Sequence, residues 1–437
     1  MAPSRLKRLE SLLGFAALIG VICVSGFATP ITAYAGSLQV VVSFAGKNGV
    51  QPSAGLTSAN GVLYGTTTYG GLNAYYGGLY GYGTLFSYSV KDGIQSLESF
   101  GAGTAAAAAS PASPLLNVDG TLYGTASGMM SSGTLFSYSQ ANNFQVLAAF
   151  VGTNGSDPLG SLSNIGGTLY GTTESSNIIN VGTLFSYSKN NGIQSLSAFV
   201  GGNGADPLGV QNFGGTLFGT TFWGGKSGNG SVFSYSPITG NLQTLISFAG
   251  PNGANPDAGL VSINGTLYGT TYNGGTFGYG TLFSYNESQG LQTLVNFGGL
   301  NGAHPSASLI DVNGTLYGST EFGGTNGDGT LFGYSSTGGL QSLASFSGGD
   351  GAYPTGDLVD LGGSIYGTTK QGGAYGYGSI AGIPIDGYGT IFSYQLPMAT
   401  TTDVPEPNSL LLLSTGLMAL GVARRRRLSS GRKSLSH

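Results

Sequence analysis

A unit of about 49 residues recurs seven times, and this repeat constrains the fold more than any other feature of the sequence. Each copy holds three aromatic positions, in an L-Y-G step, a T-L-F-S-Y step and an L-Q-x-L-x-x-F step. In the middle of the chain each series advances by 47 to 50 residues per copy. A fixed period of this size indicates an array, a solenoid or a propeller. The first series comprises Tyr64, Tyr123, Tyr170, Phe218, Tyr268, Tyr317 and Tyr366.

Four short runs in each copy have the composition of β-strands. In the copy at residues 259–297 they are rich in Leu, Val, Thr, Tyr and Phe, and each is bounded by Gly or Asn. Asn264 and Gly265 link the first two runs, and Asn-Gly is the favoured two-residue hairpin turn because both positions tolerate positive φ. No window outside the two ends of the chain has a helical period. The four runs are residues 260–263, 266–271, 281–285 and 291–297.

These runs predict an all-β protein, a seven-bladed β-propeller built from four-stranded repeats of about 49 residues. A β-solenoid is the alternative, although its parallel coils suit Asn-Gly hairpins badly. The order of strands at the two ends favours a ring. The body begins with a fourth-strand run at residues 38–44 and ends with a third-strand run at residues 390–394. We therefore expect the N-terminal strand to close the last blade, which removes an open sheet edge.

The first 35 residues have the pattern of a secretory signal peptide. Arg5, Lys7 and Arg8 precede an apolar stretch at residues 12–27. Cleavage is expected between Ala35 and Gly36. An uncleaved membrane anchor is the alternative. The single cysteine lies within this segment, so the predicted mature chain has no thiol for a disulfide or a thiolate metal site.

The body of the chain is acidic and lacks arginine. Between Gly36 and Asp403, five lysines stand against sixteen acidic residues, a balance of −11. Nucleic-acid binding relies on clustered cations that contact phosphates. Nucleic acid is therefore excluded as an expected partner.

The sequence changes character after the repeat body, which ends at residue 397. A linker at residues 398–408 contains Pro405, Glu406 and Pro407, and a hydrophobic segment with a basic end follows at residues 409–427, before a tail at 428–437. By the positive-inside rule the basic end stays cytoplasmic while the body, residues 36–397, lies outside. An ordinary C-terminal membrane anchor is the alternative. The basic end consists of Arg424, Arg425, Arg426 and Arg427.

This tripartite end resembles the PEP-CTERM sorting signal of Gram-negative bacteria, with all three parts in order between Val404 and Arg427. The resemblance implies the export machinery and an exosortase as partners, transient membrane anchoring through the C-terminal segment, and delivery to the cell surface or extracellular matrix. Proteins with this signal typically accompany exopolysaccharide production and biofilm formation. The repeats resemble the tandem GloVer repeats of surface proteins, through the pattern G-T-L-Y-G-T-T … G-G … G-T-L-F-S-Y at residues 265–285. That resemblance transfers no catalytic residue.

Function is expected on the face with the longer and more variable loops. If the strands of a blade are called a to d, the b–c loops and d–a connections share one face, which we call the loop face. Two b–c loops, at residues 68–83 and 370–389, are expanded, and ring closure would make them neighbours. Tyrosine and tryptophan on such loops suit stacking against sugar rings or a protein surface, whereas packing on one another is the alternative. The candidate binding residues are Tyr69, Tyr75, Tyr76, Tyr80, Tyr82, Phe222, Trp223, Tyr375, Tyr377 and Tyr388.

The d–a connections share an N-G-x-x-P pattern in which the residue before the proline varies. The proline is expected to restrict this residue to an extended conformation. Asp157, Asp206 and Asn255 occupy the position in three copies, and such a ring of oxygen ligands leaves a bound calcium ion as an alternative. Dense carboxylate spacing is absent, so we expect solvated turn residues and no metal.

Candidates for catalysis are few. The body holds one histidine, His304, and no G-x-S-x-G motif surrounds any serine. Acids close in sequence, Asp357 with Asp360 and Glu321 with Asp328, leave a carboxylate-based glycan hydrolase or lyase as an alternative. We expect no catalytic residue and no cofactor. The prediction is an exported surface protein that binds exopolysaccharide or a surface partner, with a purely structural matrix protein as the other alternative.

Overall fold

A computed structural model describes residues 36–72, 81–101, 109–111, 113–128, 132–174, 181–375, 377–380 and 383–397, without the side chains of 377–386. The predicted signal peptide and the segment from residue 398 onwards, which holds the predicted sorting motif, lie outside the described residues. Among the residues described, none belongs to a helix long and apolar enough to cross a membrane.

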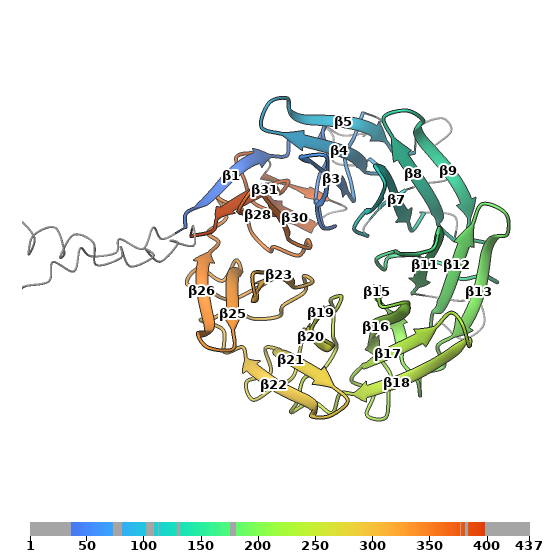
Figure 1. Cartoon of the computed structure of the whole chain (residues 1–437). Coiled ribbons are helices and arrows are strands. Elements are labelled where there is room, and N and C mark those ends of the chain that lie inside the picture. The colour runs from blue at the N-terminus through green and yellow to red at the C-terminus, as the bar shows by residue number, and fades with distance from the viewer. Residues whose placement is uncertain are drawn as a thin grey trace, which may run out of the picture. The chain divides into compact units, whose positions relative to one another are not determined.

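Seven antiparallel sheets of four main strands form the blades of a ring, so the predicted propeller is confirmed (Figure 1). Blade 1 consists of β2 (Thr57–Ala59), β3 (Val62–Thr67), β4 (Thr84–Ser89) and β5 (Gly93–Ser99). Blade 2 consists of β6 (Leu116–Val118), β7 (Thr121–Ala126), β8 (Thr134–Ser139) and β9 (Asn143–Ala149). Blade 3 consists of β10 (Ser163–Ile165), β11 (Thr168–Thr173), β12 (Thr183–Ser188) and β13 (Gly192–Ala198). Blade 4 consists of β15 (Gln211–Phe213), β16 (Thr216–Trp223), β17 (Ser231–Ser236) and β18 (Asn241–Ser247).

The remaining blades repeat this order. Blade 5 consists of β19 (Val261–Ile263), β20 (Thr266–Thr271), β21 (Thr281–Asn286) and β22 (Gly290–Asn296). Blade 6 consists of β23 (Ile310–Val312), β24 (Thr315–Thr320), β25 (Thr330–Ser335) and β26 (Gly339–Ser345). Blade 7 consists of β27 (Val359–Leu361), β28 (Ser364–Thr369), β31 (Thr390–Gln395) and β1 (Leu38–Ser43). Three strands were not predicted: β14 (Ala205–Pro207) joins β16, and β29 (Tyr377–Ile380) pairs with β30 (Ile383–Asp386) in the expanded loop of blade 7.

The two ends of the body meet in blade 7. Strand β1 pairs antiparallel with β31, with Leu38 opposite Tyr394. Figure 1 shows this pair as the blue strand beside the red one. The N–H of Phe44 continues the pairing by donating to the carbonyl of Gly389 at 3.0 Å. The prediction that the N-terminal strand completes the last blade is confirmed.

The core is a belt of phenylalanine pairs, one at each interface between neighbouring blades. The Phe that ends one d strand meets the Phe of the next c strand, and the ring centroids lie 5.0 to 5.4 Å apart. All of these rings are buried. Burial of one such side chain contributes on the order of 2–3 kcal/mol. The pairs are Phe44–Phe86, Phe100–Phe136, Phe150–Phe185, Phe199–Phe233, Phe248–Phe283, Phe297–Phe332 and Phe346–Phe392.

Two kinds of glycine let the strands close on this belt. A β-carbon on Gly269, in an L-Y-G step, would lie 2.7 Å from the ring of Phe283 and 2.8 Å from Leu260. Only glycine therefore fits this close approach. In the a–b turn, Asn264 and Gly265 have φ values of 50° and 78°, as the predicted hairpin turn requires.

The prediction for the residue before each d–a proline is wrong. In all seven blades this residue has a φ of 53° to 58°, the left-handed region, instead of an extended conformation. The reason is a hydrogen bond between blades: the N–H donates to a carbonyl in the b–c loop of the preceding blade, as from His304 to Tyr279 at 2.8 Å. This repeated bond compensates for a backbone strain of about 1–3 kcal/mol per residue. The residues are Gln51, Ser110, Asp157, Asp206, Asn255, His304 and Tyr353.

Candidate functional site

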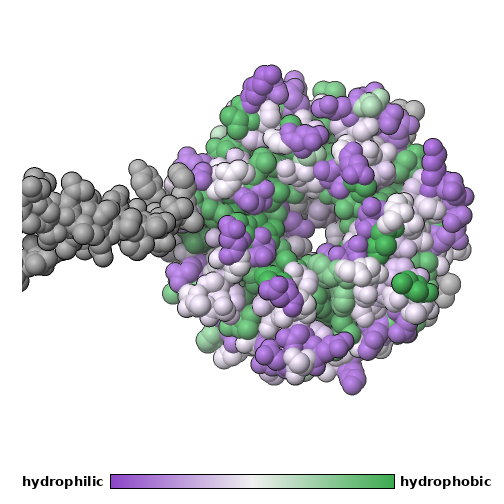
Figure 2. All heavy atoms as spheres, viewed as in Figure 1, coloured by the Kyte–Doolittle hydropathy of each residue, from purple (hydrophilic) through white to green (hydrophobic). Residues whose placement is uncertain are grey.

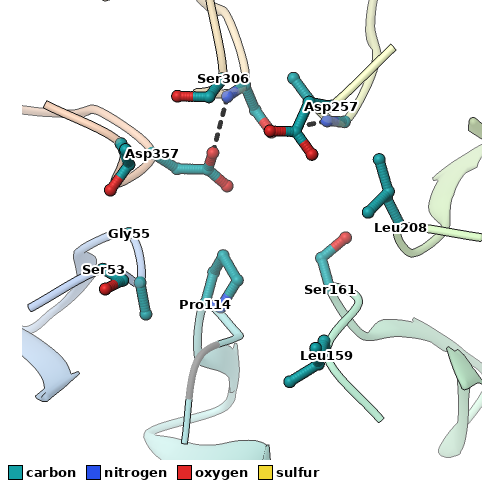
Figure 3. Close-up of a pocket in the computed structure, with 14 residues that line it drawn as sticks. Ser53, Gly55, Pro114, Leu159, Ser161, Leu208, Asp257, Ser306 and Asp357 are labelled. Carbon is teal, nitrogen blue, oxygen red and sulfur yellow. Dashed lines mark hydrogen bonds between the residues drawn. The ribbon is translucent and has the colours of Figure 1, made fainter. Parts of the chain in front are cut away.

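The inner strands surround a central channel, which is open in Figure 2. A cavity of about 120 Å³ lies in it, and Figure 3 shows its lining. Each blade contributes the segment that follows its d–a proline. The first residue after the proline is apolar in blades 3 and 4 and polar in blades 5, 6, 7 and 1. These lining residues are Leu159, Leu208, Asp257, Ser306, Thr355 and Ser53.

Asp357 ties three blades together from the wall of this channel. Its Oδ1 accepts a hydrogen bond from the N–H of Ser308 at 2.7 Å, and the Oγ of Ser308 accepts one from the N–H of Gly259 at 2.9 Å. Burial raises the pKa of Asp357, while the bonds from Ser308 oppose that rise. Asp360, the acid paired with it by sequence, is exposed on β27 and does not line the cavity. The geometry thus gives Asp357 a structural role between blades.

Asp257 faces the same cavity without a partner. Its carboxylate makes no hydrogen bond or ion pair among the described residues. Burial raises the pKa of Asp257 to about 7, with a further rise from Glu321 and Glu174 and an opposing effect from Lys370. Asp257 lies deep in the molecule, but the channel leaves it partly accessible.

Three more acids extend this negative region over blades 3 and 4. Asp157 and Asp206 precede the d–a prolines, and Glu174 follows β11. Burial raises the pKa of Glu174, and the charges of Asp206 and Asp157 raise it further. Burial also raises the pKa of Asp157 and of Asp206. No cation in the described part of the chain pairs with these carboxylates.

Asn255, the third member of the possible calcium ring, is occupied by other contacts. Its side chain is buried, and its Nδ2 donates to the carbonyl of Phe222 at 3.0 Å. Its Oδ1 accepts a hydrogen bond from the Nδ2 of Asn273 at 3.2 Å. Within the described ranges, no three His, Cys, Asp or Glu side chains are grouped so that they could hold a metal ion.

A continuous series of aromatic rings crosses the loop face from blade 4 to blade 7, and we call it the aromatic arc. Centroids of successive rings lie 4.6 to 6.5 Å apart. A further ring, Tyr279, meets His304 edge-on at 5.7 Å. Trp223 is 49% exposed and Tyr279 is 43% exposed, so the arc offers accessible aromatic surface. In order, the arc consists of Trp223, Phe222, Tyr272, His304, Phe322 and Tyr353, with Tyr279 attached.

Hydrogen bonds fix the middle of the arc. The hydroxyl of Tyr272 donates to Oε2 of Glu321 at 2.9 Å. The Nδ1 of His304 lies 2.9 Å from the carbonyl of Tyr272 and donates to it in the tautomer that carries the proton there. Burial, the charge of Glu321 and the hydrogen bond from the Tyr272 hydroxyl to Glu321 raise the pKa of Tyr272, so its hydroxyl stays protonated. Asp328, the acid paired with Glu321 by sequence, lies in the b–c loop of blade 6.

Two tyrosines of the predicted patch between blades 1 and 7 are packed side chains. Tyr69 and Tyr388 pack around the fully buried Val50. The N–H of Val50 donates to the carbonyl of Tyr69 at 2.8 Å. We call these three residues the seam. The sequence left two possibilities for these tyrosines, an open binding surface or packing on neighbouring residues. Tyr69 and Tyr388 are packed.

The other predicted residues of the expanded loops fall into two groups. Tyr82 lies beside Gly101, where a β-carbon would be 2.0 Å from the tyrosine ring, yet it is 37% exposed, and Tyr375 is 55% exposed. The remaining residues cannot be placed because they, or their side chains, lie outside the described residues. They are Tyr75, Tyr76, Tyr80 and Tyr377.

Of the ten predicted binding residues, only Phe222 and Trp223 belong to the arc. The missed members lie outside the two expanded loops on which the sequence-based prediction concentrated. The signal that could have found most of them is positional: apart from Tyr279 in a b–c loop, each arc residue stands at or just after the end of a b strand, or directly before a d–a proline. The missed residues are Tyr272, Tyr279, His304, Phe322 and Tyr353.

Two family models match the chain. A model described as Gloeobacter/Verrucomicrobia repeat matches residues 20–211 and 181–381, and one described as PEP-CTERM protein-sorting motif matches residues 403–427. Among solved structures, the chain resembles a crystal structure of a nidogen/laminin complex at 12% identity and a TM-score of 0.41, over 61% of this chain and 90% of that one. It also resembles TolB from Acinetobacter baumannii at 13% identity and a TM-score of 0.40, over 59% of this chain and 58% of that one. No curated protein sequence matches significantly.

Proposed function

Since this chain belongs to the Gloeobacter/Verrucomicrobia repeat family and carries a PEP-CTERM sorting motif, it is an exported cell-surface protein that an exosortase processes, and we propose that its propeller binds extracellular polysaccharide. The binding surface is the aromatic arc on the loop face. Residues 1–35 act as the signal peptide, and the C-terminal segment anchors the chain in the membrane until processing. The mature protein then acts in the extracellular matrix, where it contributes to biofilm cohesion.

The single observation that carries this proposal is the exposed aromatic surface formed by four consecutive blades. Trp223 at one end and Tyr279 near the middle offer flat apolar area, and the rings between them are held by contacts with one another. Aromatic rings of this kind stack on the C–H faces of sugars and lose little side-chain entropy on binding. An arc of several rings in series suits a linear polymer better than a single small molecule.

The proposed role is binding without catalysis. The Nδ1 of His304 forms a hydrogen bond with the backbone carbonyl of Tyr272, and Glu321 accepts a hydrogen bond from the Tyr272 hydroxyl. Asp357 is engaged between blades, away from the exposed Asp360. These contacts position the arc, and no two of these groups are arranged as an acid and a base around a substrate bond.

The experiment is retention of the full-length chain on the exopolysaccharide of the producing cells. The double variant Trp223→Ala/Tyr279→Ala should lose retention, while the matched control Tyr375→Ala, an exposed tyrosine of the loop face outside the arc, should keep it. Equal retention of both variants contradicts the proposal. Release of new reducing ends from the polysaccharide during incubation contradicts binding without catalysis.

A further inference from the structure

Polar side chains stand among the rings in the middle of the aromatic arc, where blades 5 and 6 meet. Glu321 follows β24 directly, and its Oε2 accepts a hydrogen bond from the hydroxyl of Tyr272 at 2.9 Å. The N–H of Glu321 donates to the carbonyl of His304 at 3.0 Å. The rings of His304 and Tyr272 lie 4.6 Å apart between centroids. We call Glu321, Tyr272 and His304 the polar cluster.

Each side-chain proton on a polar atom of this cluster is already used. The carbonyl of Tyr272 can only accept, so the Nδ1 of His304, 2.9 Å away, carries the proton of the neutral imidazole. The Nε2 of His304 is then an acceptor. The proton of the Tyr272 hydroxyl is directed to Glu321, and a carboxylate has none of its own. The polar cluster therefore offers acceptors and no donor.

Two of these acceptors have no protein partner. The Oε1 of Glu321 and the Nε2 of His304 make no hydrogen bond with the described residues, and no described cation forms an ion pair with Glu321. Both residues are half-buried, and neither atom is among the buried polar atoms that lack a partner. Both atoms are therefore open to solvent, and a ligand that covers this part of the arc has to supply hydrogen-bond donors to them.

A sugar hydroxyl matches these two atoms because it brings a donor on a small neutral group. Its hydrogen bond to a carboxylate is charge-assisted, and such bonds are roughly twice as strong as neutral ones. A carboxylate or sulfate substituent would bring only acceptors, and its charge would repel that of Glu321. Elsewhere in the arc the indole N–H of Trp223 and the hydroxyl of Tyr279 are donors, so this requirement is local to the polar cluster.

Resting on the proposed function, we infer that the polysaccharide is a neutral polymer with free hydroxyl groups, and that Glu321 is the residue that selects it. The sugar rings stack on the aromatic rings of the arc. One hydroxyl of the sugar above the polar cluster donates to the Oε1 of Glu321, and another donates to the Nε2 of His304. Stacking supplies contact area, whereas the polar cluster distinguishes a free hydroxyl from a substituted one.

The test compares two forms of one polymer that share a backbone and differ in their hydroxyl groups. Fragments of the exopolysaccharide of the producing cells, and the same fragments after O-methylation, are titrated into the full-length chain at pH 8 in a calorimeter. Methylation turns each hydroxyl donor into an ether that only accepts, so the unmethylated fragments should bind at least tenfold tighter. Equal or tighter binding of the methylated fragments overturns the inference. Tight binding of fragments that carry carboxylate or sulfate groups also overturns it.

Two variants assign this preference to one residue. Glu321→Gln keeps an oxygen that accepts from Tyr272 and places an amide N–H donor where the other oxygen was. It should reduce the preference for unmethylated fragments about tenfold and leave urea denaturation unchanged. The matched control is Glu174→Gln, because Glu174 directly follows β11 at the same place in the repeat but lies outside the arc. Equal effects of the two variants overturn the inference.

The outcomes also distinguish this inference from the function on which it rests. Equal binding of both forms, weakened in Trp223→Ala, leaves polysaccharide binding at the arc standing and rejects the selection by Glu321. Binding of neither form, together with no retention on the native exopolysaccharide, rejects both.

Discussion

The aromatic arc and the seam are both built from aromatic residues on the loop face, yet their side chains lie in different environments. At the seam, Tyr69 and Tyr388 surround a buried valine and act as part of the core. In the arc, each ring contacts the next, and Trp223 remains half exposed. The expanded loops beside the seam carry the exposed Tyr375, whereas the arc joins the exposed Trp223 and Tyr279 to a continuous series of rings.

The difference shows that loop length and tyrosine content do not decide whether an aromatic residue is available for binding. At the seam, a buried apolar residue lies beneath the two tyrosines. This residue is Val50, and it is fully buried there. In blades 5 and 6 the corresponding positions are Ala254 and Ala303, which are too small to draw neighbouring rings inward. Four predictions test this comparison, in order of decreasing expected effect.

The largest effect is expected in the phenylalanine belt beside the seam. Phe86 is fully buried and meets Phe44 at 5.2 Å. Phe86→Ala should lower the free energy of unfolding by about 3–5 kcal/mol, because it removes buried apolar surface and leaves a cavity. Urea denaturation of the detergent-solubilised full-length chain measures this loss. A loss below about 1 kcal/mol would show that the belt does not hold the ring together.

A smaller loss of stability is expected at the seam itself. Tyr388→Ala should lower the free energy of unfolding by about 1–3 kcal/mol, since the half-buried ring packs on Val50. Retention on polysaccharide should not change, and Tyr375→Ala serves as an exposed control for stability. Loss of retention without loss of stability in Tyr388→Ala would make the seam a binding surface and reverse the comparison.

In the arc, substitution should weaken polysaccharide binding and leave stability unchanged, the opposite of the result expected at the seam. Trp223→Ala should weaken polysaccharide binding about tenfold, or about 1.4 kcal/mol, because the exposed indole provides contact area for sugars. Its stability should stay within about 0.5 kcal/mol of the parent chain. Calorimetric titration and urea denaturation of the same preparation check the two halves of this prediction. Unchanged affinity would remove the arc from the binding surface.

The channel wall next to the arc is expected to confer a pH dependence that the seam lacks. The folded pKa of Asp257 is raised to about 7, above the ordinary value for an aspartate, so between pH 4 and 7 the folded chain keeps a proton that the unfolded chain has lost. The free energy of unfolding should therefore fall as pH rises through this window, by less than about 1.4 kcal/mol per pH unit. Asp257→Asn should flatten this slope in part, because Asp357, Glu174, Asp157 and Asp206, whose pKa values are also raised, contribute with the same sign. The seam variant Tyr388→Phe should leave the slope as it is, and an unchanged slope in Asp257→Asn contradicts the assignment.

The fold could be predicted because its determinants are local and repeated. Alternation of apolar residues, Asn-Gly turns such as Asn264-Gly265, and glycines opposite phenylalanine rings recur in nearly every copy. Ring closure followed from the type of the first and last strands alone. The observed β1–β31 pair agrees with that argument.

The site could be predicted only in part, because it depends on contacts between copies. Trp223 and Phe222 were identified as unusual residues on a loop, whereas Tyr272 and His304 join them only through the packing of blades 4, 5 and 6. The left-handed residue before each proline was missed for a related reason. Local steric rules favour an extended conformation there, but the hydrogen bond to the preceding blade selects the other one.

The central claim is that polysaccharide binds at the arc and not at the seam, and the only tryptophan of the chain reports on it directly. Trp223 fluorescence should change saturably as exopolysaccharide fragments are added, with the same midpoint as calorimetric binding. Tyr388→Phe should leave the titration unchanged, and Tyr279→Ala should shift its midpoint to higher concentration. Calorimetric binding with no change in Trp223 fluorescence would contradict the account, because the ligand would then lie elsewhere on the propeller.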